Sequence, residues 1–377
     1  MKIGLVCPYN IVKGGGVQEI VLATHAELTR RGHTVRIITP LPRDTDVIDV
    51  PDCIFVGVST DFRSPMRTTA QVSATADTEK INQMLQDEDF DVLHFHEPWI
   101  PVLSRQILAR SQSVNIATFH AKVPETLMSR TVVRVVTPYL KSVLKDLHML
   151  TAVSDSAAEY VGGLTDEPIT IIPNGIDLAK YRAPLKKAKK KTGKTILFIG
   201  RLERRKGVKY LLQAYSLLVQ QQPDVKLVIA GDGPDREKLE LLAEDLGLHN
   251  VSFLGFISED LKLQLLKEAD IFCSPAVFGE SFGIVLLEAM ATGVITVAGN
   301  NSGYSDVMQD LGAVSIVNPR DDLEFARRLQ LLLTNEPLRT LWQSWAADYV
   351  QQFDWPHVVD QYEEFYHEAL KQHGHQA

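Results

Sequence analysis

Short apolar runs alternate with segments of helical periodicity along most of the chain. The first run, Lys2–Cys7, predicts a buried strand that Pro8 ends, and the apolar positions of 17–28 then recur at helical spacing. Further strands are predicted at Thr34–Thr39, Ile54–Val58, Asp91–Phe95, Asn115–Phe119, Met149–Val153 and Ile169–Ile172. Helical patterns lie between most of them. This alternation is typical of a mostly parallel sheet that helices cover on both faces.

A polar, strongly positive segment, Lys186–Lys194, interrupts the alternation and is interpreted as a linker. Behind it, a second series of strands is predicted at Thr195–Ile199, Lys226–Ala230, Val251–Leu254, Asp270–Cys273 and Val294–Val297. The chain closes with an amphipathic helix over about 357–371. Two successive series of this kind predict two doubly wound α/β domains in tandem, with the ligand site in the cleft between them.

Length and composition agree with this organisation and narrow the class of protein. A chain of 377 residues is long enough for two domains, and its 45% hydrophobic and 23% charged residues are typical of a globular protein. The net charge of −8 argues against nucleic acid as a partner. Its 3 cysteines lie too far apart for a disulfide framework or a zinc motif, and no apolar run approaches a membrane span. We therefore expect a cytoplasmic enzyme.

A glycine triplet, Gly14–Gly16, lies between the first predicted strand and the first predicted helix. Backbone N–H groups at such a helix start favour an anion, and glycine lets a phosphate approach the main chain closely. An ordinary flexible turn has the same composition, so the triplet alone does not decide between the two interpretations.

The second domain opens with a charged segment, residues 200–207, directly after its first strand. Arg201 and Lys206 fall at the edge of the sheet where doubly wound domains bind ligands, and their charges suit a diphosphate. Arg204 and Arg205 are interpreted as solvated charges. The segment is not a P-loop, because it lacks the GxxxxGK[ST] pattern, and Gly231–Arg236 lacks the third glycine of a dinucleotide-binding motif.

Two glutamates, Glu280 and Glu288, mark the most specific segment of the chain. Glu280 is predicted to precede a helix that Ser281 caps, and the eight-residue spacing puts the two carboxylates on the order of 12 Å apart along the axis. We expect one carboxylate to bond a sugar and the other to bond a ribose. The alternative is that Glu288 is an ordinary surface residue. Its neighbours are all apolar and argue against that alternative: Leu286, Leu287, Ala289 and Met290.

Histidines end two strands of the first domain. His94 and His96 share one strand face at a spacing typical of metal ligands, and His120 at the end of the next strand is the only obvious third ligand. A metal-dependent hydrolase is therefore an alternative, although packing at the strand end is the favoured interpretation of His94 and His96. His120 is expected at the rim of the domain, as a polar group near a reacting sugar. Two acidic strings are interpreted as solvated: Asp44–Asp46 and Asp87–Asp89.

Together these segments resemble the retaining glycosyltransferases of family 4, which have the GT-B fold. The matching pieces are GGGVQ at 14–18, HEP at 96–98, TFHA at 118–121, AVSD at 152–155, IPNGID at 172–177, GRLERRKG at 200–207 and ESFGIVLLEAMATG at 280–293. The resemblance covers essentially the whole chain. Within the family, VCPYN at 6–10 and HEPW at 96–99 make the chain most similar to the phosphatidyl-myo-inositol mannosyltransferases.

The resemblance implies an acceptor domain of residues 1–182 completed by a returning helix, 357–377. It also implies a nucleotide-sugar donor domain of residues 195–356, with residues 183–194 as the Lys-rich linker. The implied donor-binding residues are Gly15, Gly16, Arg201, Lys206, Glu280, Ser281, Phe282, Gly283 and Glu288. Of these, Glu280 would bond hydroxyls of the donor sugar and Glu288 the ribose.

Four residues are implied at the reacting centre: His120, Arg201, Lys206 and Glu280. Tyr9 and Gln18 match positions that contact the inositol acceptor. The chain departs from the mannosyltransferases at Val58–Asp61, where they carry a Tyr-Asn pair. It also lacks their basic membrane helix, because Thr75–Met84 holds one lysine and two acids.

The expected reaction is transfer of a hexose, mannose from GDP-mannose first, to a polyol, glycan or lipid-linked acceptor with retention of configuration. No metal or other cofactor is expected, and only weak association with the inner membrane face. An epimerase or phosphorylase acting on nucleotide sugars, and a sensor that binds them without catalysis, remain as alternatives on the same architecture.

Overall fold

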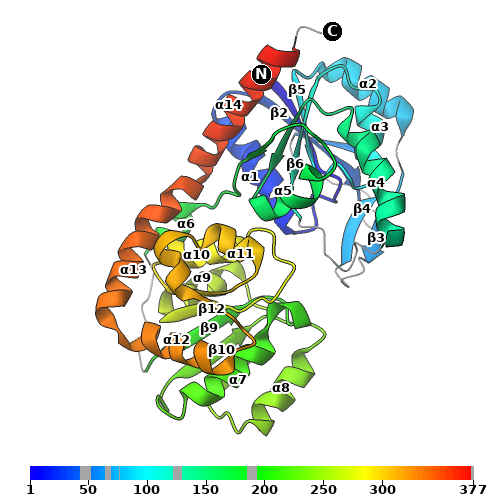
Figure 1. Cartoon of the computed structure of the whole chain (residues 1–377). Coiled ribbons are helices and arrows are strands. Elements are labelled where there is room, and N and C mark those ends of the chain that lie inside the picture. The colour runs from blue at the N-terminus through cyan, green and yellow to red at the C-terminus, as the bar shows by residue number, and fades with distance from the viewer. Residues whose placement is uncertain (43–51, 64–68, 76, 122–129, 185–192, 375–377) are drawn as a thin grey trace. The chain divides into compact units, whose positions relative to one another are not determined.

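A computed structural model describes residues 1–42, 52–63, 69–75, 77–121, 130–184 and 193–374. The chain forms two compact units (Figure 1). Unit 1 comprises Met1–Gly175 and Trp355–Ala377, and unit 2 comprises Ile176–Asp354. Among the described residues, no helix combines the length and the apolar character that crossing a bilayer requires.

Unit 1 is built on an eight-stranded sheet in the order β4-β3-β2-β1-β5-β6-β7-β8. The strands are β1 Lys2–Val6, β2 Thr34–Leu41, β3 Cys53–Arg63, β4 Thr69–Ser73, β5 Val92–His96, β6 Val114–Phe119, β7 Met149–Ala152 and β8 Ile169–Ile171. Every neighbouring pair is parallel except β3 and β4. The sequence pattern predicted all of these strands except β4, a short antiparallel edge strand.

Helices lie between most of the consecutive strands of unit 1. They are α1 Gly16–Arg30, α2 Thr78–Glu88, α3 Leu103–Leu108, α4 Arg130–Leu144 and α5 Asp155–Gly162, and the terminal helix is α14 Trp355–His373. Helix α14 packs on α1 and contributes Val359, Tyr362 and Tyr366 to the core that surrounds β1. The apolar face predicted for 357–371 is therefore buried in unit 1, and the returning helix of the prediction is confirmed.

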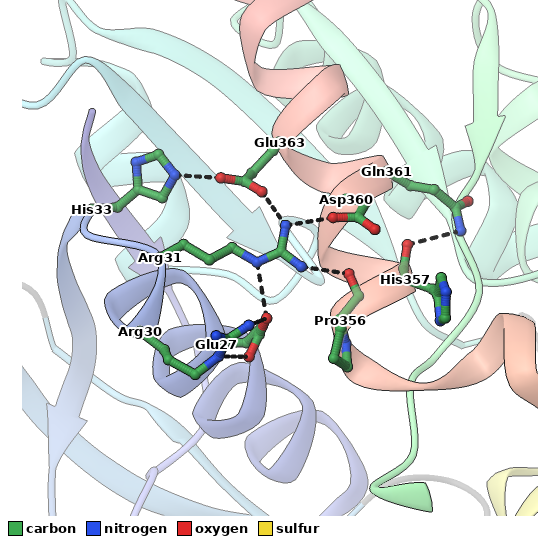
Figure 2. Close-up of polar contacts among 9 residues, drawn as sticks. All are labelled: Glu27, Arg30, Arg31, His33, Pro356, His357, Asp360, Gln361 and Glu363. Atoms are coloured by element: carbon green, nitrogen blue, oxygen red, sulfur yellow. Dashed lines mark hydrogen bonds and ion pairs between the residues drawn. The ribbon is translucent and has the colours of Figure 1, made fainter.

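Arg31, at the end of α1, holds α14 in place through a polar network (Figure 2). Its guanidinium donates to Asp360 Oδ1 at 2.6 Å, to Glu363, and to the backbone carbonyl of Pro356 at 2.6 Å. On its own helix it donates to Glu27 Oε1 at 2.9 Å. Burial opposes the guanidinium charge, but the surrounding carboxylates outweigh it and raise the Arg31 pKa. The network thus adds ion pairs to the apolar contact between the two helices.

Unit 2 contains a six-stranded parallel sheet in the order β11-β10-β9-β12-β13-β14. Its strands are β9 Thr195–Ile199, β10 Lys226–Ala230, β11 Val251–Gly255, β12 Ile271–Ser274, β13 Ile295–Gly299 and β14 Ile316–Val317. Its helices are α6 Leu178–Arg182, α7 Val208–Leu218, α8 Arg236–Asp245, α9 Glu259–Glu268, α10 Ile284–Ala291, α11 Ser302–Val307, α12 Asp322–Thr334 and α13 Glu336–Tyr349. The predicted tandem of doubly wound α/β domains is confirmed.

The boundary between the units differs from the predicted one. The chain enters unit 2 after Gly175, because the Ile176 N–H donates to the Phe353 carbonyl at 2.7 Å and the Leu178 N–H to Asp354 Oδ1 at 3.2 Å. The segment 183–194 therefore connects α6 to β9 inside unit 2 and does not join the units. Most of its lysine cluster, 185–192, lies outside the described residues.

Candidate active site

Each unit has one point where the strand order reverses, and most of the predicted site residues follow the strands that meet there. In unit 1 the point lies between β1 and β5; in unit 2 it lies between β9 and β12. The carboxyl ends of parallel strands at such a point form the crevice in which doubly wound domains bind ligands. One group of predicted site residues lies within each unit.

The glycine triplet opens α1 in unit 1. Helix α1 begins at Gly16, and no side chain caps its N-terminus. A Cβ added at Gly14 or Gly16 would have open space around it, whereas one at Gly15 would lie 2.5 Å from Gln18 Oε1. Gln18 is buried and donates to the carbonyls of Asn10 at 3.4 Å and Lys13 at 3.1 Å. Gln18 thus orders the loop before the triplet, and its contact with an acceptor stays a prediction.

His94 links the sheet to the returning helix. Its Nδ1 lies 2.8 Å from the hydroxyl of Tyr366 on α14, and its Nε2 lies 2.6 Å from Thr118 Oγ1 on β6. Both ring nitrogens therefore already bond side chains, which supports the packing interpretation over the metal interpretation. In the described part of the chain, no three His, Cys, Asp or Glu side chains are grouped as a metal ion would require.

His120 lies at the carboxyl end of β6, where the sequence pattern placed it, and is 8% exposed. Its Nε2 is 2.8 Å from His96 Nδ1, and its backbone N–H donates to Glu97 Oε1 at 2.7 Å. Burial lowers the pKa of His120 to about 3, and that of His96 well below its ordinary value. Both imidazoles are therefore neutral, so one hydrogen lies between them and the ring offers its other nitrogen, Nδ1, for bonding.

Arg205 is the central cation of unit 2, contrary to the prediction that it is solvated. Residues 204–206 form a 3₁₀ turn after β9, and the Arg205 side chain is 19% exposed. Its Nε donates to Glu203 Oε1 at 2.6 Å, and its Nη1 donates to Glu280 Oε1 at 2.5 Å. The neighbouring Arg204 is exposed, as predicted. The turn directs one of two adjacent arginines inward, which sequence pattern alone does not distinguish.

Glu280 and Lys206 are brought together by the pairing of β9 with β12. Lys206 Nζ lies 2.8 Å from Glu280 Oε1, the same oxygen that Arg205 contacts. The side chain of Arg201 is 47% exposed and lies 3.8 Å from Glu203. The described surroundings of Glu280 therefore hold its carboxylate through one oxygen, while the Arg201 side chain is about half exposed.

Helix α10 begins at Ile284, later than the sequence predicted. Gly283 is the N-cap residue, with a φ of 105° that favours glycine, and no side chain caps the helix. The prediction that Ser281 caps this helix is therefore wrong, because the loop continues for two residues beyond it. Phe282 is buried against Phe353, with ring centroids 6.1 Å apart.

Glu288 is buried on α10, as its apolar neighbours indicated, and is not a surface residue. Its Oε1 accepts hydrogen bonds from the Tyr181 hydroxyl at 2.5 Å and from Lys262 Nζ at 2.8 Å. The attraction of Glu288 and Glu259 outweighs desolvation and raises the pKa of Lys262, so the lysine stays charged. Like Glu280, Glu288 is held through one carboxylate oxygen by a cation and a second donor.

Comparison of the sequence with known proteins assigns the chain to a family. Residues 14–180 match the model described as Glycosyltransferase Family 4, and residues 181–347 match Glycosyl transferases group 1. The chain is 35% identical over 368 residues to the phosphatidyl-myo-inositol mannosyltransferase of Mycolicibacterium smegmatis, covering 96% of this chain and 92% of that protein. The chain belongs to glycosyltransferase family 4. It is an enzyme of the hexosyltransferase class.

Solved structures agree on the fold of this glycosyltransferase. Sucrose-phosphate synthase from Thermosynechococcus elongatus matches with a TM-score of 0.77 at 20% identity, covering 98% of this chain and 99% of that one. Anabaena HepE in complex with UDP-glucose matches with a TM-score of 0.73 at 19% identity, covering 98% and 100%. The GT-B fold that the sequence motifs implied is therefore confirmed.

In this glycosyltransferase, four residues of the candidate site were missed by sequence reasoning: Glu97, Tyr181, Arg205 and Lys262. Glu97 carries a weak signal, as an acid directly after a buried strand in the HEP segment. In the sequence, nothing distinguished Arg205 from its exposed neighbour Arg204. Tyr181 and Lys262 occur in amphipathic patterns, in which an exposed position is the ordinary expectation. Of the acidic strings, Asp87 and Asp89 are exposed as predicted, and Asp44–Asp46 lies outside the described residues.

Proposed function

We propose that this glycosyltransferase transfers mannose from GDP-mannose to an inositol-containing acceptor with retention of configuration. The observation that carries the proposal is the 35% identity, over 96% of the chain, to an enzyme named phosphatidyl-myo-inositol mannosyltransferase. The segments matched by the two family models, 14–180 and 181–347, include His120, Lys206 and Glu280. Tyr9, Lys206 and Glu280 follow strands at the reversal point of their unit, and His120 follows β6, the strand next to β5.

On the donor side, Arg201 and Lys206 would stabilise the diphosphate as it leaves. Charge develops on the phosphate oxygens while the bond to the sugar breaks, and fixed cations lower the energy of that transition state. The backbone N–H groups around Gly15 and Gly16 would add dipoles of the same sign. In this proposal these groups supply the positive charge, so no metal ion is needed.

The two glutamates would orient the donor. Arg205 and Lys206 hold Glu280 through Oε1, and Tyr181 and Lys262 hold Glu288 through Oε1. The second oxygen of each carboxylate would then accept a hydrogen bond, from a sugar hydroxyl at Glu280 and from the ribose at Glu288. Carboxylates held in this way need little reorganisation when the donor binds.

For the reaction itself, we propose attack on the face from which the diphosphate leaves. The bond from the anomeric carbon to the phosphate oxygen breaks, a bond to the acceptor oxygen forms, and the acceptor proton passes to the leaving phosphate oxygen. His120 would bond a hydroxyl of the sugar as a neutral imidazole through Nδ1. Tyr9 and Gln18 would lie on the acceptor side.

The charges on α2 indicate how strongly this helix is attracted to a membrane that carries the acceptor. Its side chains include the single cation Lys80 and the acids Glu79, Asp87 and Glu88. Anionic lipid attracts basic helices and repels acidic ones. We therefore propose that recognition rests on the polyol headgroup, with little electrostatic attraction of α2 to the membrane.

The purified full chain, supplied with GDP-mannose or UDP-glucose, tests this function. The acceptors are free myo-inositol and phosphatidylinositol in phosphatidylcholine vesicles, with products identified by mass spectrometry and their anomeric configuration by NMR. We expect an α-mannoside from GDP-mannose. A β-linked product, a preference for UDP-glucose, or conversion of the donor without any acceptor would contradict the proposal.

A further inference from the structure

Glu97 is a buried acid that the reaction outlined above does not use. It follows β5, is 0% exposed, and has a φ of 51°, which is uncommon for a residue with a side chain. Its Oε1 accepts the backbone N–H of His120 at 2.7 Å. The Ala121 N–H and the Trp99 indole also face this carboxyl group, although its buried Oε2 makes no close hydrogen bond within the described residues. The backbone conformation thus places a carboxyl group directly beneath the first residue after β6.

Neutral or weakly acidic groups surround Glu97. The titratable groups that face it are Tyr9 after β1, His96 on β5 and His120 after β6. The ring of His94 lies against that of His96, tilted by 30° with 4.2 Å between ring centroids. Within the described residues, no Lys or Arg forms an ion pair with Glu97. A carboxylate buried without a cation is costly, so the group takes up a proton instead. Burial accordingly raises the pKa of Glu97 to about 8.

Among the described residues, three polar atoms at or near His120 are buried without a close hydrogen-bond partner: His96 Nε2, His120 Nδ1 and Asn174 Oδ1. The Asn174 side chain lies near enough to the His120 ring to interact with it as a longer hydrogen-bond partner. Unpaired polar atoms destabilise a folded protein, and a group of them around one residue indicates a functional requirement. The residue that these atoms share as a neighbour is His120.

We propose that Glu97 is a positioning residue which, as a neutral carboxylic acid, holds His120 in the orientation that its role at the sugar requires. The inference rests on the proposed function of His120. Oε1 holds the backbone, and the His96 ring holds the imidazole. Ionisation of Glu97 would leave a carboxylate buried beneath His120 without a cation, which is costly. The segment that carries His120 would move to relieve that charge, and Nδ1 would lose its orientation toward the substrate.

Glu97→Gln distinguishes a neutral positioning group from an ionised one. Glutamine keeps an oxygen for the His120 N–H and stays neutral at every pH. At pH 7 we expect Glu97→Gln to retain kcat within about threefold, and Glu97→Ala to lose kcat by about 10-fold or more with a small change in donor KM. The wild-type rate should fall as pH rises through about 8, and the Glu97→Gln rate should not. Equal losses in both variants at pH 7 would overturn the proposal.

A stability measurement tests the protonation state without any transfer assay. The native acid keeps its proton up to about pH 8, whereas the unfolded chain loses it near its ordinary pKa, so the contribution of Glu97 to stability is lost as pH rises between the two. The Tm of Glu97→Gln minus that of wild type should therefore increase from pH 5 to pH 8. A constant difference would overturn the neutral-acid assignment.

Glu27→Gln is the matched control in the same unit. Arg30 and Arg31 lower the pKa of Glu27, so this carboxylate stabilises the protein above its ordinary pKa and its replacement should lower Tm at pH 7. The two Gln variants should thus differ in sign. If the stability result holds but no transfer is detected, the proposed function fails and the neutral acid stands. If transfer occurs but Glu97→Gln behaves like Glu97→Ala, the positioning role fails alone.

Discussion

The Tyr181 hydroxyl donates a hydrogen bond to Glu288 Oε1 at 2.5 Å, across 107 positions of the sequence. Lys262 bonds the same oxygen at 2.8 Å, so a phenol and an ammonium group hold the carboxylate from α6 and α9. A carboxylate held through one oxygen presents the other in a defined direction. In the proposed function, Tyr181 would therefore act on the donor indirectly, by orienting Glu288.

Tyr181→Phe should weaken donor binding more than it slows the chemical step. Removing one hydrogen bond to a carboxylate lets Glu288 rotate, and we expect donor KM to rise about 3- to 10-fold with kcat nearly unchanged. Steady-state kinetics with the preferred nucleotide sugar measure both values. Tyr210→Phe removes a hydroxyl elsewhere in unit 2 and serves as the control. An unchanged KM in Tyr181→Phe would remove Tyr181 from the donor site.

Two adjacent arginines provide a sharper comparison. Arg205→Ala leaves Glu280 and Glu203 without their shared cation, so we expect kcat/KM to fall by about 10-fold or more. Arg204→Ala changes an exposed side chain next to it and should keep kcat/KM within about twofold of wild type. Similar losses of kcat/KM in both variants would show that activity depends on the net charge of this segment and not on the contact between Arg205 and Glu280.

Arg31→Ala should destabilise unit 1. The change removes the cation that Glu27, Asp360 and Glu363 share, and leaves three carboxylates facing one another. We expect a loss of about 2 kcal/mol in the free energy of unfolding, measured by urea denaturation. Arg30→Ala is the control, because the Arg30 side chain is 65% exposed and contacts only Glu27 of this network. Equal stability of Arg31→Ala and wild type would contradict the role given to the network.

Acid should destabilise the protein through its buried histidines. Burial lowers the pKa of His94 and of His120 to about 3, so the native state stays neutral while the unfolded chain binds protons below its ordinary pKa. Stability is therefore lost as pH falls from about 6.5 toward 3, by about 1.4 kcal/mol per pH unit for each such histidine. Replacing His120 by Gln should reduce the slope of unfolding free energy between pH 5 and pH 6 by about that amount. An unchanged slope would mean that native His120 is protonated.

Secondary structure was largely readable from the sequence, because each strand and helix carries its own local pattern. The strands Thr195–Ile199 and Lys226–Ala230 begin and end where the pattern predicted. Strand β4 was missed because its sequence, TAQVS, contains only two apolar residues among polar ones and leaves no clear strand signal. The start of α10 was misplaced because Gly283, with its positive φ, ends the preceding loop later than a capping serine would.

The residue types of the site were also visible in the sequence, but their pairings were not. The motifs alone pointed to Lys206, Glu280, Glu288 and His120. They did not show which of two neighbouring arginines turns inward, or that Glu97 lies beneath His120. Those contacts join residues 75 and 23 positions apart. They exist because β9 pairs with β12 and β5 with β6, which brings the ends of distant strands together. Local periodicity determines the elements, whereas strand order determines which charges are neutralised and which acid is buried without a cation.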